Sequence, residues 1–485
     1  MIRVWADGRK AGILDRLRPA GSTFAYDPLA PQEHAVSITM PVRVQSWDQK
    51  HGLLPIFEMN LPEGALRERL TRQFAKATGT FDDFDLLGIV GRTQIGRLRY
   101  SSLDQDLSDT LPLQSIDEIL RARRDGGLFN HLLEQYSQHS GLSGVQPKVM
   151  IRAKDSKLSG PKLRKSPSIQ SATHIVKFWD EDEFPELAAN EYFCLQVAKQ
   201  LGMTVPSFQL SDDGGALVVE RFDVVEDRYL GFEDFCVLNS LGTADKYKGG
   251  YETRIFRRLR DFHAPGEAQK SLEELFRLFV LNCAIRNGDA HLKNFGVIYD
   301  RIDGPIRMAP VYDLVTTWAY LPTDPMALTI EGSTRWPNRS GILRLAKTRS
   351  DLSEKKAGQI IEAVADVMVT VAVQMKKYFS DRKSDIGRRI ADAWNAGISD
   401  SLGLVRGLTT VAKPDSVPKE RLAESDGVIL EYLRRNGGSA SGTLKALSAV
   451  LSIPQSTLSA SIKRLVDSGF VQRTSRRITL APREV

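Results

Sequence analysis

The chain has 485 residues, of which 42% are hydrophobic, and its formal net charge at pH 7 is +6. This length exceeds what one hydrophobic core supports, so several domains are expected. No apolar run approaches the roughly 20 residues that cross a bilayer, and the first residues lack the regions of a signal peptide. We therefore expect a cytoplasmic protein with no membrane contact. The modest positive charge allows a nucleic-acid partner without requiring one.

The three cysteines, Cys194, Cys236 and Cys283, are far apart and have apolar neighbours. Their spacing matches neither a zinc site nor a disulfide framework. We expect buried free thiols in a reducing compartment.

Residues 1–105 have the pattern of a small α/β domain. Arg3–Ala6 and Gly12–Leu17 predict a hairpin around an Asp-Gly turn, and Ala35–Met40 predicts a further strand. Phe57–Gly64 leads into a predicted helix, because proline, glutamate and glycine stand at its start.

A polar linker over residues 101–113 precedes residues 114–405, in which predicted strands come first and helices later, as in a two-lobed kinase. Ser140–Lys148 is a Gly/Ser loop, and glycines let backbone N–H groups approach phosphates closely. An ordinary turn between strands is the alternative. The loop residues predicted to contact a nucleotide are Ser143, Gly144, Val145, Gln146 and Lys148.

Lys177 lies at the centre of the apolar strand His174–Phe178. A buried strand lysine suits the pairing with nucleotide phosphates that kinases use, and a lysine reaching solvent from an edge strand is the alternative. Glu191, at the start of the next predicted helix, could form an ion pair with Lys177. Val218–Asp223 predicts a strand that runs into a polar segment, where an interlobe hinge would offer backbone groups to adenine.

The most specific motif is Asn287–Asn294, followed by Asp313. Asp289 and Asn294 have the spacing of the kinase catalytic loop, in which the aspartate orients and deprotonates the acceptor hydroxyl. Asn294 and Asp313 supply the oxygen ligands that Mg²⁺ prefers. An isolated pair at this spacing is usually a cap or a turn, but a predicted helix precedes this one and two predicted strands follow it. These elements are Leu272–Ile285, Phe295–Tyr299 and Ile306–Met308.

Six motifs follow one another along residues 1–405. They are Ser143–Gln146, Thr173–Lys177, Asn190–Tyr192, Glu220–Asp223, Gly288–Phe295 and Pro310–Asp313. Together they resemble the HipA family of serine/threonine kinases, the toxins of bacterial type II toxin–antitoxin systems, and Phe57–Gly64 is similar to a motif of the family's N-terminal domain. The resemblance implies an α+β fold, with a two-lobed protein-kinase-like fold of the HipA type after a small N-terminal α/β domain.

The resemblance implies ATP and Mg²⁺ as cofactors, with Asp289 as catalytic base, Lys177 as phosphate anchor, and Asn294 and Asp313 as Mg²⁺ ligands. Further nucleotide contacts are expected at Glu220, Phe222, His291 and Lys293. Family members phosphorylate an aminoacyl-tRNA synthetase and halt translation. We therefore expect a protein substrate of that kind, an antitoxin and a homodimer as partners.

Family members also phosphorylate a serine of their own Gly-rich loop, which ejects the loop and stops the kinase. This chain departs from many members, because Gly141 stands at the position of that serine. Ser143 matches a serine that smaller relatives use. It is the predicted self-phosphorylation site, with Ser140 as the second choice.

Residues 421–485 follow a linker over residues 406–420 and have the pattern of a winged helix-turn-helix domain. The predicted helices and strands are Ser425–Arg435, Thr443–Leu451, Gln455–Asp467, Phe470–Arg473 and Arg477–Leu480. In such domains the third helix enters the major groove, so DNA is a predicted partner, and a protein-binding role is the alternative. The predicted DNA-binding residues are Gln455, Ser459, Lys463, Arg464, Arg476 and Arg477.

Three functions are compatible with these motifs. A toxin-type protein kinase with its own DNA-binding domain is the leading prediction. A small-molecule phosphotransferase would share the Gly-Asp-x4-Asn loop, but the N-terminal domain and the loop serine argue against it. A transcription regulator that only senses nucleotide has no reason to retain the four residues Lys177, Asp289, Asn294 and Asp313.

Overall fold

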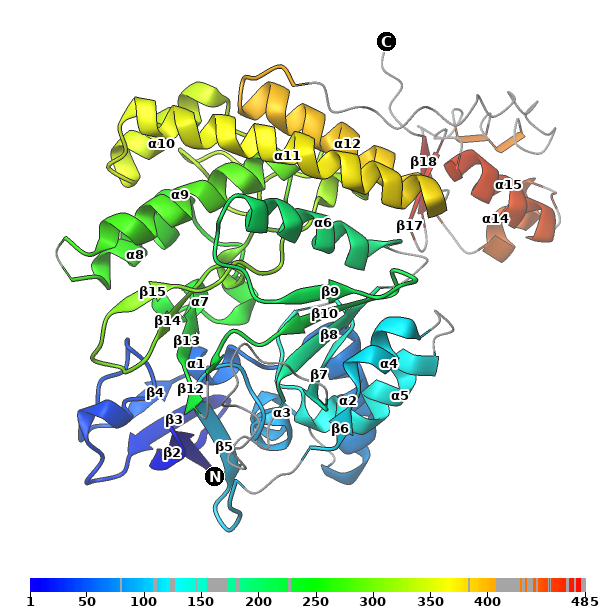
Figure 1. Cartoon of the computed structure of the whole chain (residues 1–485). Helices are drawn as coiled ribbons and strands as arrows, with labels where there is room; N and C mark the ends of the chain where they lie inside the picture. Colours follow the sequence, from blue (N-terminus) through cyan, green and yellow to red (C-terminus); the bar gives the residue numbers. More distant parts are fainter. Residues whose placement is uncertain are drawn as a thin grey trace. The chain divides into compact units, whose positions relative to one another are not determined.

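The computed structural model divides the chain into two compact units, Met1–Val411 and Ala412–Val485. Figure 1 traces both units along the sequence. The described residues are all of the 485 except 79–80, 108–110, 123–126, 145, 155–171, 180–183, 226–227, 265, 383, 407–427, 430–431, 434–438, 442–443, 452, 454, 468–470, 475–476 and 481–485.

A five-stranded antiparallel sheet in the order β4-β3-β2-β1-β5 opens the first unit. Its strands are β1 (Ile2–Ala6), β2 (Arg9–Leu17), β3 (Gly21–Tyr26), β4 (Trp47–Gln49) and β5 (Leu98–Ser102). The predicted hairpin between β1 and β2 is confirmed. Its turn residues Asp7 and Gly8 both have positive φ, as the favoured two-residue hairpin turn requires. Three helices come between β4 and β5: α1 (Pro55–Glu58), α2 (Gly64–Thr78) and α3 (Asp83–Val90).

The strand predicted over Ala35–Met40 is wrong, because this segment forms one isolated bridge and joins none of the described sheets. Side chains bond its backbone groups instead. Tyr26 Oη donates to the carbonyl of Met40, and Glu233 Oε1 accepts from the N–H of Ile38 at 2.8 Å. With distant side chains satisfying these backbone groups, the apolar segment needs no neighbouring strand.

A second five-stranded sheet, in the order β6-β7-β8-β10-β9, carries the predicted phosphate-binding lysine. Its strands are β6 (Leu113–Gln114), β7 (Lys148–Ala153), β8 (His174–Phe178), β9 (Phe208–Leu210) and β10 (Ala216–Glu220). Side chains alternate along β10, so Leu217 and Val219 join the core around helix α6 (Leu187–Gln200). Ala216 and Val218 join the core of the N-terminal sheet, so one apolar core continues from the first sheet to one face of the second.

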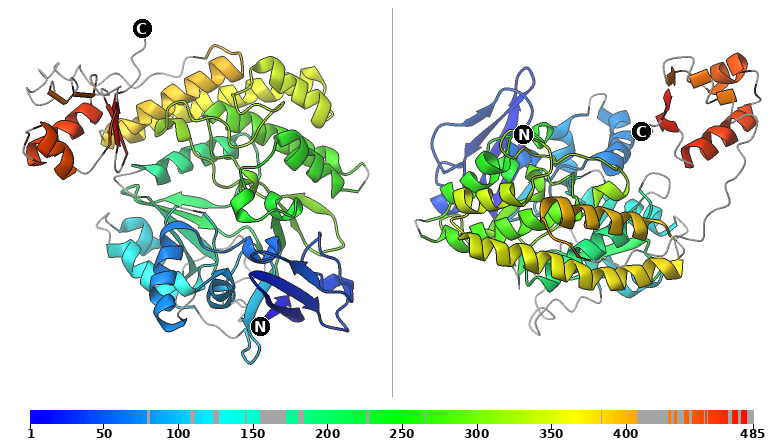
Figure 2. Two further views of the ribbon diagram at one scale, coloured as in Figure 1. Left: turned by 180° about the vertical axis from the view of Figure 1, so that it is seen from behind. Right: turned by 90° about the horizontal axis from the view of Figure 1, so that it is seen from above.

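Helices α9 to α12 form a layer beyond α6, on the side of the second sheet away from the N-terminal sheet (Figures 1 and 2). They are α9 (Ala268–Ile285), α10 (Arg339–Arg349), α11 (Glu354–Arg382) and α12 (Ile386–Ala396). The predicted helix Leu272–Ile285 is the buried part of α9. Among the described residues, α11 alone is long and apolar enough to cross a membrane, a test that core helices also pass. It packs against α6, α9, α10 and α12.

A three-stranded sheet contains β13 (Gly231–Asp234), β14 (Gly296–Tyr299) and β15 (Ile306–Met308), and β14 begins shortly after the predicted catalytic motif Asn287–Asn294. The two strands predicted after the motif are confirmed as β14 and β15, and they pair with each other antiparallel. The segment between α9 and β14 therefore starts from a buried helix and ends on a paired strand, which fixes both of its ends. The other described α-helices and strands of this unit are α4 (Ile116–Arg121), α5 (Gly127–Tyr136), α7 (Phe235–Leu238), α8 (Arg257–Asp261), β11 (Val224–Val225) and β12 (Arg228–Tyr229).

The second unit has its own apolar core, to which α15 contributes Leu458, Ile462 and Leu465. Its described elements are β16 (Ser439–Ser441), α14 (Leu444–Leu451), α15 (Gln455–Asp467), β17 (Val471–Thr474) and β18 (Arg477–Leu480). The three strands pair in the order β16-β18-β17, so the two predicted strands, β17 and β18, pair with each other, and β16, which was not predicted, joins them. Of the predicted helix Ser425–Arg435, residues 428–429 and 432–433 are described, and they are helical.

Candidate nucleotide-binding site

One cavity of the first unit is lined by the Gly-rich loop, the second sheet, the segment after β10 and the segment after α9. Of the residues predicted to bind nucleotide or metal, its lining contains Ser143, Gly144, Lys148, Lys177, Glu220, Phe222, His291, Lys293 and Asp313. Gln146 donates instead to the carbonyl of Phe178 at 3.1 Å, and Val145 lies outside the described residues. The fold therefore gathers residues from most of the predicted motifs around one space.

Lys177 on β8 contacts two carboxylates in the cavity. Its Nζ donates to Glu191 Oε1 on α6 at 2.6 Å and to Asp313 Oδ1. Burial disfavours the ammonium, but these two carboxylates outweigh it and raise the pKa of Lys177 above its usual value. Burial also opposes ionisation of Asp313, yet the charge of Lys177 holds the pKa of that carboxyl well below its usual range. Lys177 and Asp313 are therefore both charged at neutral pH.

Lys148 brings a second buried ammonium into the cavity, opposite Lys177 in the pairing of β7 with β8. Its Nζ lies beneath the Gly-rich loop, where a Cβ on Gly144 would come within 2.5 Å of it. Burial lowers the pKa of Lys148, and no carboxylate among the described residues forms an ion pair with it. A buried cation without a partner, facing a cavity, indicates a site for an anion.

Asp289 lies in the turn after α9, just beyond the left-handed residue Arg286. It is exposed between buried neighbours and does not itself line the cavity. Its Oδ1 accepts a hydrogen bond from Tyr247 Oη at 2.8 Å. Desolvation by the surrounding protein raises the pKa of the Asp289 carboxyl, and the hydrogen bond from Tyr247 opposes that rise. Tyr247 thus shows that a hydroxyl can bond to this carboxylate, as an acceptor hydroxyl must.

Asn294 ends the short 3₁₀ turn that follows Asp289, and its Oδ1 is buried with no hydrogen-bond partner among the described residues. Asp313 has a φ of 52°, a strained left-handed conformation for a residue other than glycine. In the described part of the chain, no group of three or more His, Cys, Asp and Glu side chains could hold a metal ion. Mg²⁺ does not need such a group, because it takes one or two protein oxygens and completes its shell with phosphate and water. The free amide oxygen and the carboxylate fit that requirement.

His291 and Lys293 both line the cavity but differ in what they can offer. Burial lowers the pKa of His291 to about 3, so the imidazole is neutral. Its Nδ1 is buried and has no hydrogen-bond partner in the described part of the chain. Lys293 Nζ instead bonds Asp234 Oδ2 at 2.8 Å and the Met59 carbonyl at 2.7 Å. The Lys293 charge is therefore already compensated within the protein.

The predicted hinge lies at the edge of the cavity. β10 ends at Glu220, and the ring of Phe222 stacks on Tyr312 with 5.9 Å between centroids. Arg221, which lies between Glu220 and Phe222 in the sequence, is fully buried and donates to Asp223 Oδ2 at 2.6 Å. Burial raises the pKa of the Glu220 carboxyl. The hinge is thus held by a buried ion pair and an aromatic stack.

The two candidate serines of the Gly-rich loop have different surroundings. Ser140 is fully buried, and its hydroxyl donates to the Tyr136 carbonyl and accepts from the Met150 N–H, each at 2.8 Å. Ser143 is half-buried, lines the cavity and donates to Glu63 Oε1. Only Ser143 therefore has its hydroxyl at the cavity.

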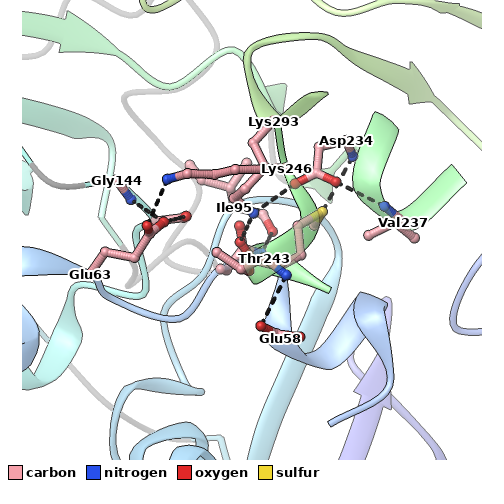
Figure 3. A network of polar contacts seen from close by, with 12 residues as sticks. Glu58, Glu63, Ile95, Gly144, Asp234, Val237, Thr243, Lys246 and Lys293 are labelled. Atoms are coloured by element: carbon pink, nitrogen blue, oxygen red, sulfur yellow. Dashed lines mark hydrogen bonds and ion pairs between the residues drawn. The ribbon is translucent and has the colours of Figure 1, made fainter. Parts of the chain in front are cut away.

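Part of the site comes from the N-terminal domain, which local sequence patterns did not indicate (Figure 3). Glu63 accepts from Ser143 and from the Gly144 N–H, and it forms an ion pair with Lys246 at 2.8 Å. Burial alone would raise the pKa of Glu63, but the hydrogen bonds from Lys246 and Ser143 lower it to about 2. The available signal was the Phe57–Gly64 motif, which predicted only a helix start.

In the second unit, α15 carries four of the predicted DNA-binding residues. Gln455 and Lys463 are exposed and Ser459 is half-buried, while the side chain of Arg464 is not among those described. In the predicted wing, Arg477 begins β18, and Arg476 lies outside the described residues.

Comparisons with known proteins identify the family that the chain resembles. The model of the HipA N-terminal domain matches residues 2–101, and that of the HipA-like C-terminal domain matches residues 140–372. "Putative kinase Y4mE" of Sinorhizobium fredii is 30% identical over 68% of this chain and 80% of its own length. "Serine/threonine-protein kinase toxin HipA" of Shewanella oneidensis is 24% identical over 55% of this chain and 64% of its own length.

Among solved structures, a chain from the complex of HipA, HipB and operator DNA of Shewanella oneidensis is similar to this one. Its TM-score is 0.58 at 18% identity, with 83% of this chain and 98% of that chain covered. At this identity the similarity shows the fold alone. The mixed α/β fold of the HipA type is thereby confirmed.

Proposed function

The chain belongs to the HipA family, and on that premise we propose that it is an ATP- and Mg²⁺-dependent serine/threonine protein kinase of the toxin type. One observation carries the proposal. Lys177 contacts both Glu191 and Asp313 in a cavity that is also lined by His291 and Lys293, two residues that lie between Asp289 and Asn294 in the sequence. This is the set of charges that phosphoryl transfer requires.

We assign the triphosphate of ATP to the cationic side of the cavity. Lys177 and Lys148 supply two buried ammonium groups there, and the neutral His291 has a ring nitrogen with no hydrogen-bond partner among the described residues. Adenine would lie near Glu220 and Phe222 at the predicted hinge. Asn294 Oδ1 and Asp313 would hold Mg²⁺, which supplies neutralisation of phosphate charge when bound.

The acceptor hydroxyl would bond to Asp289, as Tyr247 does in this structure. A substrate serine or threonine that replaces the Tyr247 hydroxyl would be aligned by the same carboxylate oxygen, which then takes up its proton. Because Asp289 is exposed, a hydroxyl on a separate protein can reach it. An aminoacyl-tRNA synthetase is the substrate that the family suggests, with growth arrest as the consequence.

Self-phosphorylation in the Gly-rich loop is proposed for Ser143. Ser143 lines the cavity, whereas the hydroxyl of Ser140 is buried and bonded on both sides. A phosphate dianion at Ser143 would favour an open loop and lower activity.

For residues 421–485 we propose a winged helix-turn-helix domain that binds DNA, after a kinase domain at 114–405 and an N-terminal domain at 1–105. The support is α14, α15 and a basic hairpin in the expected order, with Gln455 and Lys463 exposed on α15. The similar chain of known structure comes from a complex with HipB and operator DNA, which favours an antitoxin and DNA as partners here too. A homodimer would supply the second DNA contact.

The test incubates the full-length protein with Mg²⁺, γ-labelled ATP and a bacterial lysate. We expect label on a distinct protein band, and a loss of roughly 10²-fold or more in Asp289→Asn. Asp303→Asn is the matched control, because Asp303 is an exposed carboxylate that bonds only its neighbour Arg301 among the described residues. Label confined to small molecules would favour a small-molecule phosphotransferase. Nucleotide binding without any transfer would favour a nucleotide-sensing regulator.

A further inference from the structure

Glu63 belongs to the N-terminal domain, yet its carboxylate lies at the Gly-rich loop (Figure 3). Oε1 accepts from the Ser143 hydroxyl and from the Gly144 N–H, the latter at 3.0 Å. Oε2 accepts from Lys246 Nζ at 2.8 Å, and the two side chains of this ion pair are only 20% and 11% exposed. We call these three contacts the Glu63 clamp.

The segment that presents Glu63 is held in place by one contact with the catalytic half of the molecule and one within the N-terminal domain. The Met59 carbonyl accepts from Lys293 Nζ at 2.7 Å, and Asn60 Nδ2 donates to the Ile95 carbonyl at 2.9 Å. Gly64, with a φ of 53°, turns the chain directly into α2. The carboxylate of Glu63 is therefore presented by a braced segment rather than by a free side chain.

The Gly-rich loop has a second anchor on the same domain. The Gly141 N–H donates to the Thr93 carbonyl at 3.0 Å, and a Cβ on Gly141 would come within 2.7 Å of that oxygen and of the Gln94 side chain. This contact fixes the beginning of the loop, whereas the Glu63 clamp holds the part that lines the cavity. Loss of the clamp would therefore free residues 143 and 144 without detaching the loop base.

We propose that Glu63 is a positioning residue that holds the Gly-rich loop over the nucleotide cavity and makes the loop position depend on the charge at Ser143. A neutral Ser143 hydroxyl donates to Glu63 and closes the loop. A negative group at Ser143 removes that donor and sets like charges in contact, so the loop opens.

The inference deepens the proposed kinase function, from which it takes the phosphorylation of Ser143. In that step the Ser143 oxygen forms a bond to the γ-phosphorus, the bond between that phosphorus and ADP breaks, and the hydroxyl proton passes to a carboxylate or to solvent. The Gly144 N–H alone then remains to contact Glu63. The ion pair with Lys246 keeps Glu63 in place, so the loop moves and the carboxylate does not.

The first test measures hydrogen exchange in peptides covering residues 140–148 of the full-length protein, with and without Mg-ADP. Glu63→Gln keeps the size of the side chain but loses its charge. We expect exchange in the loop to rise about tenfold even without nucleotide, and affinity for ADP to fall by a similar factor. Glu68→Gln is the matched control on the adjoining helix α2, because Glu68 is exposed and pairs only with Arg72 among the described residues. Its exchange should equal that of the unmodified protein.

The second test asks whether Glu63 responds to charge at Ser143. Ser143→Asp and Ser143→Asn have the same size and differ by one negative charge. With Glu63 present, we expect Ser143→Asp to exchange about tenfold faster in the loop than Ser143→Asn. In the Glu63→Gln background the difference should disappear. Ser143 variants leave the braced segment intact, so the Asp-to-Asn comparison with Glu63 present can be made even if Glu63→Gln does not fold, and equal loop exchange in these two variants would overturn the inference.

An equal Asp-to-Asn difference in both backgrounds would overturn the inference, as would unchanged loop exchange in Glu63→Gln. An exchange increase that appears only with ADP bound would also overturn it, because Glu63 would then act by touching the nucleotide. Neither test requires phosphoryl transfer. Failure of the kinase assay with these exchange results intact would therefore refute the proposed function and leave the clamp standing.

Discussion

Replacement of Lys177 by methionine should destabilise the first unit in a manner that depends strongly on pH. The substitution removes the cation that lies 2.6 Å from Glu191 and also bonds Asp313. Glu191 is only 1% exposed, so an unpaired carboxylate would remain buried. Breaking a buried ion pair in this way costs about 3–5 kcal/mol.

Protonation of Glu191 sets an upper limit on this cost. A carboxyl with a usual pKa of about 4.3 takes up a proton at pH 7 for about 3.7 kcal/mol, and at pH 5 for about 1 kcal/mol. The native pKa shifts give the direction of this pH dependence. Burial raises the pKa of Glu191 even though Lys177 lowers it, so removal of Lys177 would raise that pKa further, and Lys177 also outweighs burial to lower the pKa of Asp313. The stabilisation by Lys177 therefore grows as pH rises above the unfolded pKa values of these carboxyls. We therefore expect a loss of about 3–4 kcal/mol at pH 7 that shrinks to about 1 kcal/mol at pH 5.

Urea unfolding followed by tryptophan fluorescence measures this difference in the first unit, because all six tryptophans precede residue 400. Lys347→Met is the control, since Lys347 is an exposed lysine on α10. Its stability should stay within about 0.5 kcal/mol of the unmodified protein at both pH values. An equal loss at pH 7 and pH 5 for Lys177→Met, or no loss at pH 7, would refute the electrostatic reasoning.

Three further outcomes are expected. Asp289→Asn should keep its affinity for ATP, measured by calorimetry, and should abolish growth arrest on overexpression, whereas equal toxicity would point away from kinase action. Phosphopeptide mapping after incubation with Mg²⁺-ATP should place phosphate on Ser143, and Ser143→Ala should stay active for longer in a time course; phosphate found only outside residues 140–148 would contradict this. DNA binding by the full-length protein should weaken steeply with salt. Arg476→Ala should weaken it on all sequences and Gln455→Ala should change sequence preference, as band shifts at several salt concentrations would show.

Elements with strong local signals were predictable. The Asp-Gly turn required positive φ at two positions, so the β1–β2 hairpin followed from its sequence. The apolar period over Leu272–Ile285 and the run Gln455–Asp467 likewise correspond to helices α9 and α15. The strand predicted over Ala35–Met40 was wrong, because an apolar run does not reveal that distant side chains, such as Glu233, will satisfy its backbone groups.

The sequence by itself determined which groups are candidates for the proposed chemistry and their order along the chain, since Lys177, Glu191 and Asp313 were recognisable from short motifs. Only the tertiary structure decided that Lys177 contacts both acids at once. It also decided that Glu63 reaches across 80 residues to Ser143 and across 183 residues to Lys246. The reason is physical: a motif records the neighbours of a residue along the chain, whereas a carboxylate is held by whichever donors the packing of sheets and helices brings within about 3 Å.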